Sequence, residues 1–365
     1  MKIKEIINHL ETLAPISFQE DYDNCGLLIG DKELKCTGII TTLDCIEHVV
    51  DEAIEKGCNL IVSHHPIIFK GLKKITGKNY VEETVIKAIK NDIAIYAIHT
   101  NLDNIQKGVN GKIAEKLGLV NCKILKSKDA QLKKLVTFAP FEFAEKVRNA
   151  LFEAGGGFIG KYSECSFNIE GFGTFKPMDG AQPHTGEIGK RFEGKELKIE
   201  IIFPSYIEDT LVVAMKKAHP YEEVAYDILQ LGNYLSDVGS GIIGELETGI
   251  SEYSFLQRLK DIFALKVIKH SALTSKKVKN VAICGGSGSF LIPAAIKNNA
   301  DIYITSDIKY HEFFDTDQKI LLADIGHYES EQFTIELLYE FLKQKSINFA
   351  VLKSEVITNP VHYFL

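Results

Sequence analysis

The sequence predicts an α/β protein whose core is interrupted by a second, smaller domain. Three observations carry this prediction. Both ends of the chain alternate short apolar strands with helical segments, the middle follows a different order of elements, and 365 residues exceed what one hydrophobic core usually supports. We therefore expect a discontinuous core made of residues 1–128 and 237–365, with an inserted domain at residues 129–236.

The first third of the chain alternates helical and strand patterns. Helices are expected where apolar residues recur at helical spacing, and strands where short apolar runs end at turn residues. The expected helices cover residues 2–13, 46–56, 81–91 and 109–117, and the expected strands cover residues 37–42, 59–62 and 94–97. Strands separated by helices of this length are typical of βαβ units around a mostly parallel or mixed sheet.

The last third repeats this pattern. The expected strands cover residues 278–284, 302–305 and 320–323, and the expected helices cover residues 290–298 and 332–343, with a further helical segment near His311. The first of these strands runs into the glycine-rich sequence GGSGS. The two ends of the chain are therefore predicted to be halves of one α/β domain.

The middle segment has the order strand, helix, strand, strand, helix, strand. These elements are expected at residues 134–139, 141–154, 164–172, 195–202, 207–217 and 224–229. This βαββαβ order is that of the ferredoxin-like unit, which forms a self-sufficient domain of about a hundred residues. The glycines at 155–157 are interpreted as a turn within this domain rather than as a linker.

Charge and cysteine content restrict the function classes. There are 42 basic and 49 acidic residues, a net charge of -7 without long blocks of either sign, which argues against nucleic acid as a partner. The seven cysteines form no CxxC pair, which argues against a disulfide framework or a zinc finger and favours a reducing compartment. No export signal and no apolar run of roughly 20 residues is found, so no membrane contact and a cytoplasmic location are expected.

The strongest chemical signal is the sequence NLIVSHHPIIF. A short apolar strand ends in His64 and His65, and Pro66 prevents simple continuation of the strand. Ligands of open α/β sheets gather at the carboxyl ends of strands. Adjacent residues of an extended chain point to opposite sides, so the two imidazoles are better placed for two metal ions than for one. The alternative is a surface turn that contains two histidines.

A second strand, in IAIYAIHTNLDN, leads into a loop that carries His99 and Asp103. A carboxylate has two oxygens and can bridge two cations, which an imidazole cannot do. Alone, Asp103 would be interpreted as a turn or cap residue. Its position beside a second strand end that carries a histidine makes it a candidate metal ligand.

A third strand, in KILLADIGHYESEQF, stops at Gly326, and a helix begins within GHYESE. His327 and Glu331 are four residues apart, so both side chains lie on one face of that helix and can share a metal ion. The alternative is that Ser330 caps the helix and that the acidic residues only favour its positive end.

Further polar residues follow other strands. Asp307 and His311 in TSDIKYHEF have the same spacing and are candidate catalytic acid–base groups in the wall of the site, with ligation or ligand orientation as alternatives. GGSGS suits an oxyanion, but it lacks a nucleotide-binding pattern and a tight turn is favoured. Asp23, Asn24 and Asp44 lie on turns and are interpreted as structural.

Together these residues resemble the Nif-three-like family, whose members often bear the name GTP cyclohydrolase I type 2 homolog. The motifs DNCGLLIG, SHHPIIF, HTNLDN, GGSGS, TSDIKYHEF and GHYESE occur in the family's order over nearly the whole chain. GTFKPMDGAQPHTG and HPYEEVAYD resemble the insert of longer bacterial members, which is similar to CutA and PII proteins. Two departures are small: Tyr22 replaces a common Trp, and TSD replaces the more usual TGD.

The resemblance implies a Nif-three-like α/β core with a mixed sheet and a CutA/PII-like insert. It implies a dinuclear metal centre at five residues, His64, His65, Asp103, His327 and Glu331, and a toroidal homohexamer whose metal sites face an internal cavity. The imidazole and carboxylate donors suit two divalent ions, zinc first, with iron, manganese or cobalt as alternatives.

Such a centre predicts a metal-dependent hydrolase. A hydroxide shared by the two ions would attack a C–N bond, as in purine ring opening, or a phosphate ester of a small, nucleotide-like substrate, with Asp307 or His311 carrying protons. The alternative function is a non-catalytic, metal-dependent oligomeric scaffold or a regulatory ligand-binding protein, with the insert used for sensing or assembly. Tyr221 and Tyr226 suit a packed interface in that insert.

Overall fold

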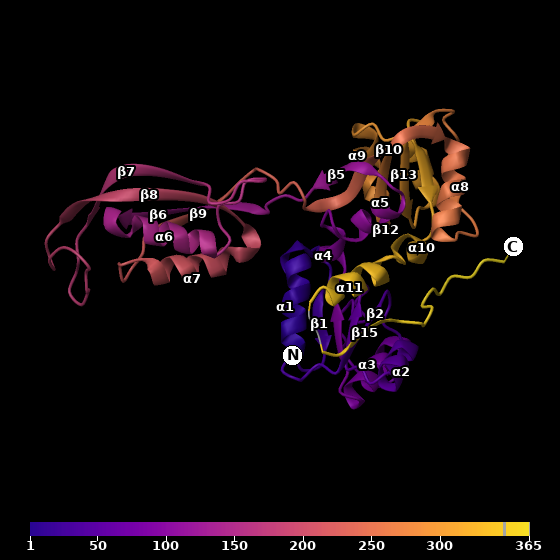
Figure 1. The fold of residues 1–365 in the computed structure, drawn as a ribbon, viewed down its shortest axis with the longest axis horizontal. Helices are drawn as coiled ribbons and strands as arrows, with labels where there is room; N and C mark the ends of the chain where they lie inside the picture. The colour runs from indigo at the N-terminus through magenta and orange to yellow at the C-terminus, as the bar shows by residue number, and fades with distance from the viewer. Residues whose placement is uncertain (346–347, 365) are drawn as a thin grey trace. The chain divides into compact units, whose positions relative to one another are not determined.

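The computed structural model describes residues 1–345 and 348–364 (Figure 1). The chain is a mixed α/β protein that divides into two compact units. The core unit contains Met1–Ser127 and Ser236–Leu365, and the inserted unit contains Lys128–Leu235. Within the described residues, no helix is both long and apolar enough to cross a membrane.

The first sheet of the core unit has the strand order β1-β4-β3-β2-β15. Its strands are β1 (Gly26–Ile29), β2 (Gly38–Thr42), β3 (Leu60–Ser63), β4 (Ala94–Ala97) and β15 (Ala350–Lys353). Neighbouring strands from β4 to β15 are parallel, and β1 is antiparallel to β4. The carboxyl ends of β2, β3 and β4 therefore lie along one edge.

Helices cover this sheet because each has one apolar face. The helices are α1 (Ile3–Leu13), α2 (Glu47–Glu55), α3 (Tyr80–Lys90) and α11 (Thr334–Lys343). Val49 of α2 and Val85 of α3 share a buried cluster with Ile40, Ile61 and Ile95 of the strands. Figure 1 shows α1 and α11 on the other side of the sheet.

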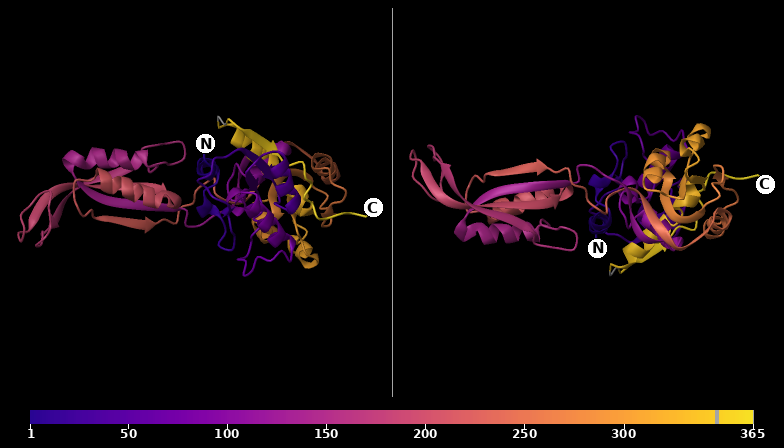
Figure 2. Two further views of the ribbon diagram at one scale, coloured as in Figure 1. Left: turned by 90° about the horizontal axis from the view of Figure 1, so that it is seen from below. Right: turned by 90° about the horizontal axis from the view of Figure 1, so that it is seen from above.

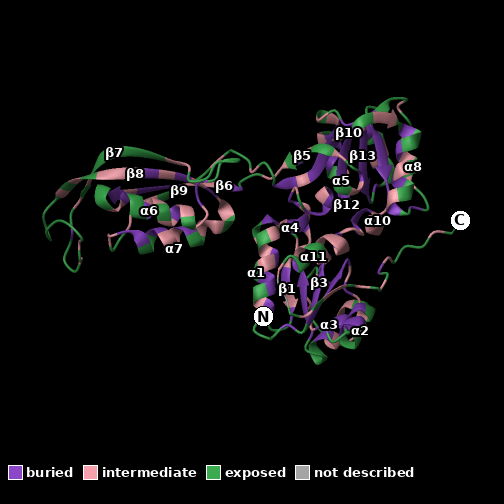
Figure 3. Cartoon of the chain, in the orientation of Figure 1, coloured by how far each residue is buried: buried purple, intermediate pink, exposed green. Residues whose placement is uncertain are grey.

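The second sheet of the core unit has the order β11-β14-β13-β12-β10-β5. Its strands are β5 (Val120–Ser127), β10 (Gly239–Ser251), β11 (Lys269–His270), β12 (Lys277–Ser287), β13 (Ile302–Ser306) and β14 (Leu321–Asp324). The strands β12, β13 and β14 are parallel, and the other pairs are antiparallel. Its helices are α5 (Val109–Lys116), α8 (Glu252–Phe263) and α9 (Ile292–Lys297). The central strands of both sheets are buried (Figure 3).

The two ends of the chain thus divide their strands between two sheets, both of them mixed. Five strands were not expected from the sequence, namely β1, β5, β10, β11 and β15. Four glycines weaken the strand signal of β10, because glycine is depleted in strands. In β5 most residues are at least partly exposed, so an apolar pattern is missing.

The inserted unit contains one four-stranded antiparallel sheet with the order β7-β8-β6-β9. Its elements are β6 (Leu132–Pro140), α6 (Phe141–Glu153), β7 (Ser166–Phe175), β8 (Phe192–Pro204), α7 (Glu208–Ala218) and β9 (Tyr226–Gln230). Figure 2 shows both helices on one face of the sheet. Leu135, Ile199 and Ile201 pack there against Val147 and Leu211. The arrangement is ferredoxin-like.

Candidate metal centre

Three segments of the core unit bring the predicted ligands together. His64 and His65 directly follow β3, and Asp103 ends α4 (Thr100–Asp103), which follows β4. His327 and Glu331 are the first and last residues of α10 (His327–Glu331), which follows β14 of the second sheet. The site is therefore built where strand ends of both sheets face each other.

One group of ligand atoms surrounds the Oε2 atom of Glu331. His65 Nε2 lies 2.9 Å from this oxygen, and His327 Nε2 lies 3.1 Å from it. The two imidazole nitrogens are 3.3 Å apart. These three side chains form a group that could hold a metal ion.

A second group uses the other oxygen of the same carboxylate. His64 Nε2 lies 3.6 Å from Asp103 Oδ1 and 3.9 Å from Glu331 Oε1. His64, Asp103 and Glu331 also form a group that could hold a metal ion. Glu331 is thus shared by two neighbouring groups, each of which contains one of the paired histidines.

Hydrogen bonds on the far side of each imidazole fix its orientation. The Nδ1 atom of His64 donates to the Ile98 carbonyl oxygen at 2.9 Å, because a carbonyl can only accept. In the same way His65 Nδ1 donates to Asp44 at 2.7 Å, and His327 Nδ1 donates to Asp307 at 2.6 Å. Each Nε2 atom is therefore directed toward the ligand groups, the arrangement that metal-ligating histidines usually show.

The electrostatics of the centre suit a cation. Burial lowers the pKa of His65, but the neighbouring Asp44 and Glu331 carboxylates outweigh it and raise that pKa to about 10. Burial is likewise outweighed at His327, where Glu331 and Asp307 raise the pKa to about 9. Burial lowers the pKa of His64. Without a metal ion, two imidazolium groups therefore compensate the charge of Glu331.

The carboxylates respond in opposite directions. Burial raises the pKa of Glu331, but the three surrounding imidazoles outweigh it and hold the pKa well below its usual value. Burial and the charge of Glu331 raise the pKa of Asp103 well above its usual value. Two carboxylates this close repel each other unless positive charge lies between them.

Three buried atoms of the centre lack a well-directed hydrogen bond among the described residues. They are His64 Nε2, Asp103 Oδ1 and Glu331 Oε2. A buried polar atom without a partner is costly, and cations coordinated in the two groups would satisfy all three atoms. The residues present therefore fit a metal ion.

A fourth histidine lies beside the predicted ligands. His99 forms a third group of candidate metal ligands with His64 and His65. Asp23 lies beside this group because it contacts His99. His99 Nδ1 donates to Asp23 Oδ1 at 2.8 Å, and Thr100 also donates to Asp23. Asp23 and Asp44 were interpreted as structural turn residues, whereas each holds an imidazole of the centre. Their positions at element junctions were the only sequence signal for this role.

The two predicted acid–base residues lie in different surroundings. Asp307 has a backbone φ of +57°. Its Oδ2 atom accepts the hydrogen bond from His327 Nδ1. Its carboxylate therefore orients an imidazole of the centre. His311 lies in a 3-10 helix (Tyr310–Thr316), is exposed, and contacts the rings of Tyr310 and Phe314.

The glycine-rich sequence at residues 285–289 makes room for the shared carboxylate. Gly286, at the end of β12, has a φ of +64°, and a Cβ atom there would lie 2.2 Å from Glu331 Oε1. Its backbone N–H donates to Ser330 Oγ at 2.9 Å. The loop was predicted as a tight turn, and its glycine proves to be needed beside Glu331.

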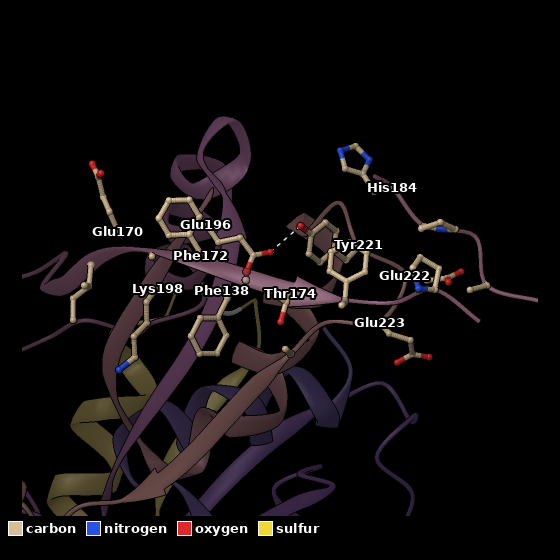
Figure 4. Close-up of a pocket in the computed structure, with 18 residues that line it drawn as sticks. Phe138, Glu170, Phe172, Thr174, His184, Glu196, Lys198, Tyr221, Glu222 and Glu223 are labelled. Atoms are coloured by element: carbon tan, nitrogen blue, oxygen red, sulfur yellow. Dashed lines mark hydrogen bonds between the residues drawn. The ribbon is translucent and has the colours of Figure 1, made fainter. Parts of the chain in front are cut away.

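A separate pocket of about 570 Å³ lies within the inserted unit, on residues of its sheet and of two loops (Figure 4). Aromatic side chains and carboxylates line it, and Tyr221 donates to Glu196 at 2.8 Å. None of the predicted site residues lines this pocket. The groups of imidazoles and carboxylates that could hold a metal ion lie in the core unit, which makes that centre the candidate functional site.

Comparisons with known proteins agree over the whole chain. The family model Duf34/NIF3 (NGG1p interacting factor 3) matches residues 1–360. The chain is 38% identical over 362 residues to a GTP cyclohydrolase 1 type 2 homolog of Bacillus subtilis (strain 168), which covers 98% of this chain and 97% of the relative. A second relative of that name, from Halalkalibacterium halodurans, is also 38% identical and covers 97% of each chain.

Solved structures show the same fold. A Bacillus cereus protein related to NIF3 has a TM-score of 0.86 and 37% identity, covering 100% of this chain and 99% of that one. A Staphylococcus aureus protein has a TM-score of 0.79 and 32% identity, with the same coverage.

Proposed function

The chain belongs to the Duf34/NIF3 family, and from this premise we propose that it is a dinuclear metal-binding protein that acts as a metal-dependent hydrolase. The observation that carries the proposal is the position of Glu331, whose two oxygens lie in two separate groups of candidate ligands. A carboxylate between two imidazole-containing groups is suited to bridge two cations.

The donor set indicates the class of metal. Three imidazole nitrogens and two carboxylates, from His64, His65, Asp103, His327 and Glu331, suit zinc first, and also iron(II), manganese or cobalt. Such ions, when bound, supply an activated water and polarise the bond that is hydrolysed. The protein supplies the fixed orientation of each ligand through Asp44, Asp307 and the Ile98 carbonyl.

Asp307 and His311 remain the proposed acid–base residues. The contact between Asp307 and His327 supports a positioning role for this carboxylate as well. The exposed His311 is proposed only as a proton carrier between the site and solvent.

The proposed reaction is hydrolysis of a C–N bond or of a phosphate ester in a small, nucleotide-like molecule. The relatives' name, GTP cyclohydrolase 1 type 2 homolog, supports the C–N alternative. The core unit provides the site, and the inserted unit, with its βαββαβ order, is proposed to be a CutA/PII-like domain. We also propose a cytoplasmic homohexamer, which the family resemblance supports.

Metal analysis followed by a substrate screen tests this proposal. We expect about two equivalents of zinc or a similar ion per chain in the purified protein, and hydrolysis of a nucleotide or phosphate ester after loading with that metal. Asp103→Ala should lose bound metal and activity together. Activity that survives complete metal depletion contradicts the proposal.

A further inference from the structure

The last described residues of the chain form a segment that runs from β15 toward the metal centre. This C-terminal segment, residues 354–364, is fixed at its start by Glu52 of α2. Ser354 Oγ donates to Glu52 Oε2 at 2.5 Å, and the Glu355 N–H donates to Glu52 Oε1 at 2.8 Å. Its backbone also continues the contact with β2, since the Ser354 N–H donates to the Thr41 carbonyl.

Farther along, the C-terminal segment contacts Asp44, which orients His65, and helix α10. Thr358 is buried, with 8% of its surface exposed, and its hydroxyl donates to Asp44 Oδ2 at 2.6 Å. The other oxygen of Asp44 accepts the Nδ1–H of His65 at 2.7 Å. The next residue, Asn359, donates to Glu329 of α10 at 3.1 Å.

We propose that Thr358 is a positioning residue for the metal centre, acting on His65 through Asp44; this rests on the proposed metal-binding function. A carboxylate can rotate about its terminal bond, and Asp44 is fixed only when both of its oxygens have partners. With Thr358 on one oxygen and His65 on the other, the imidazole ring is oriented with its Nε2 toward Glu331. Thr358 therefore belongs to the functional site.

The contacts make this effect selective for one of the two ligand groups. His65 belongs to the group with His327 and Glu331 and to the group with His64 and His99, whereas the group of His64, Asp103 and Glu331 does not contain it. His64 is oriented by the Ile98 carbonyl, and among the described residues its side chain makes no hydrogen bond to Asp44. Loss of the Thr358 hydroxyl should weaken the binding of one cation and leave the other cation nearly unchanged.

The test is a Co²⁺ titration of the metal-free, full-length protein, followed by visible absorption. Thr358→Val keeps the shape of the side chain and removes the hydroxyl, and Thr358→Ser restores a hydroxyl. Changes in the outer partners of metal ligands cost roughly 10–100-fold in metal affinity. For Thr358→Val we expect an affinity loss of about tenfold for one of the two Co²⁺ equivalents. The visible absorption band of that ion alone should change. Thr358→Ser should titrate like the wild type.

Ser354→Ala is the matched control, because it removes a hydroxyl from the same segment without contact to Asp44. It should leave both Co²⁺ equivalents unchanged. A Thr358→Val titration identical to the wild type overturns the inference, as does equal weakening of both equivalents or the same loss in Ser354→Ala. A wild-type protein that binds no cation overturns the proposed function. A wild-type protein that binds two cations, with a Thr358→Val variant that titrates identically, overturns only this inference.

Discussion

At the scale of single residues, the central feature of the candidate centre is the shared position of Glu331. Its carboxylate is buried, and its oxygens lie near imidazoles of two groups. The convergence of His64, His65, Asp103 and Glu331 was predictable because each directly follows a strand or lies in a short helix just after one. A bridging carboxylate is expected from its two oxygens, but that Glu331 is shared and Asp103 is not depends on distances between segments more than two hundred residues apart.

Glu331→Gln should therefore impair both cation sites, whereas His327→Gln should impair one. The amide removes the negative charge that both groups use, but His327 belongs to a single group. For Glu331→Gln we expect losses larger than the roughly 10–100-fold typical of an outer partner, for both ions. Competitive titration with a zinc-binding dye measures both affinities. If Glu331→Gln weakened the binding of one ion and left the other bound normally, a shared carboxylate would be refuted.

Cation affinity should depend on pH because the metal-free imidazoles hold protons. The pKa is about 10 for His65 and about 9 for His327, so both are protonated near neutral pH and must lose a proton to bind a cation. Affinity for Zn²⁺ should rise as pH increases from 6 to 9, and binding near pH 7 should release protons. Calorimetry in buffers of different ionisation enthalpy measures this release. A dissociation constant that does not change with pH contradicts it.

At the scale of elements, the end of β12 leaves the space that the Glu331 carboxylate occupies. Gly286→Ala places a Cβ atom against the Glu331 carboxylate, in addition to the strain of a positive φ. Gly57 is the matched control, because it has a φ of +67° and nothing within 4 Å of an added Cβ. Both variants should lose about 1–2 kcal/mol of unfolding free energy from backbone strain.

Only Gly286→Ala should also lose cation affinity. Thermal unfolding and Zn²⁺ titration of both variants separate the two effects. Equal cation affinity in the two variants would show that the contact between residue 286 and Glu331 has no role.

The elements that the sequence predicted poorly are those whose strand character comes from their partners. β15 has only four residues and becomes a strand by parallel pairing with β2. β10 is rich in glycine but pairs with both β5 and β12. The pattern of apolar residues within a segment contains little information about its pairing partners. The helices and the strands β3, β4 and β13 were predicted because their own apolar patterns are strong.

At the scale of the whole molecule, the inserted unit leaves and re-enters the core unit at neighbouring strands. Ser127 of β5 pairs with Gly239 of β10, so the two ends of the insertion are held close together by the core unit itself. A short glycine–serine linker from Ser127 to Ser236 should therefore replace residues 128–235 without disturbing the sheet.

The shortened protein should bind the same number of Zn²⁺ ions as the full chain, because the proposed ligands all lie in the core unit. Elemental analysis and a thermal unfolding curve check this expectation. The excised unit has its own buried cluster and should unfold cooperatively alone. Loss of all metal from a shortened protein that remains folded would assign the insertion a part in the centre.

The pairing of β15 with β2 joins the end of the chain to the sheet formed by its beginning, and α10 supplies Glu331 late in the sequence. During synthesis, the ribosome still encloses these residues when the first strands have already emerged. The proposed metal centre therefore cannot be completed before the segment that carries Glu331 has emerged, and a product that terminates before residue 331 lacks the carboxylate that two of the ligand groups share.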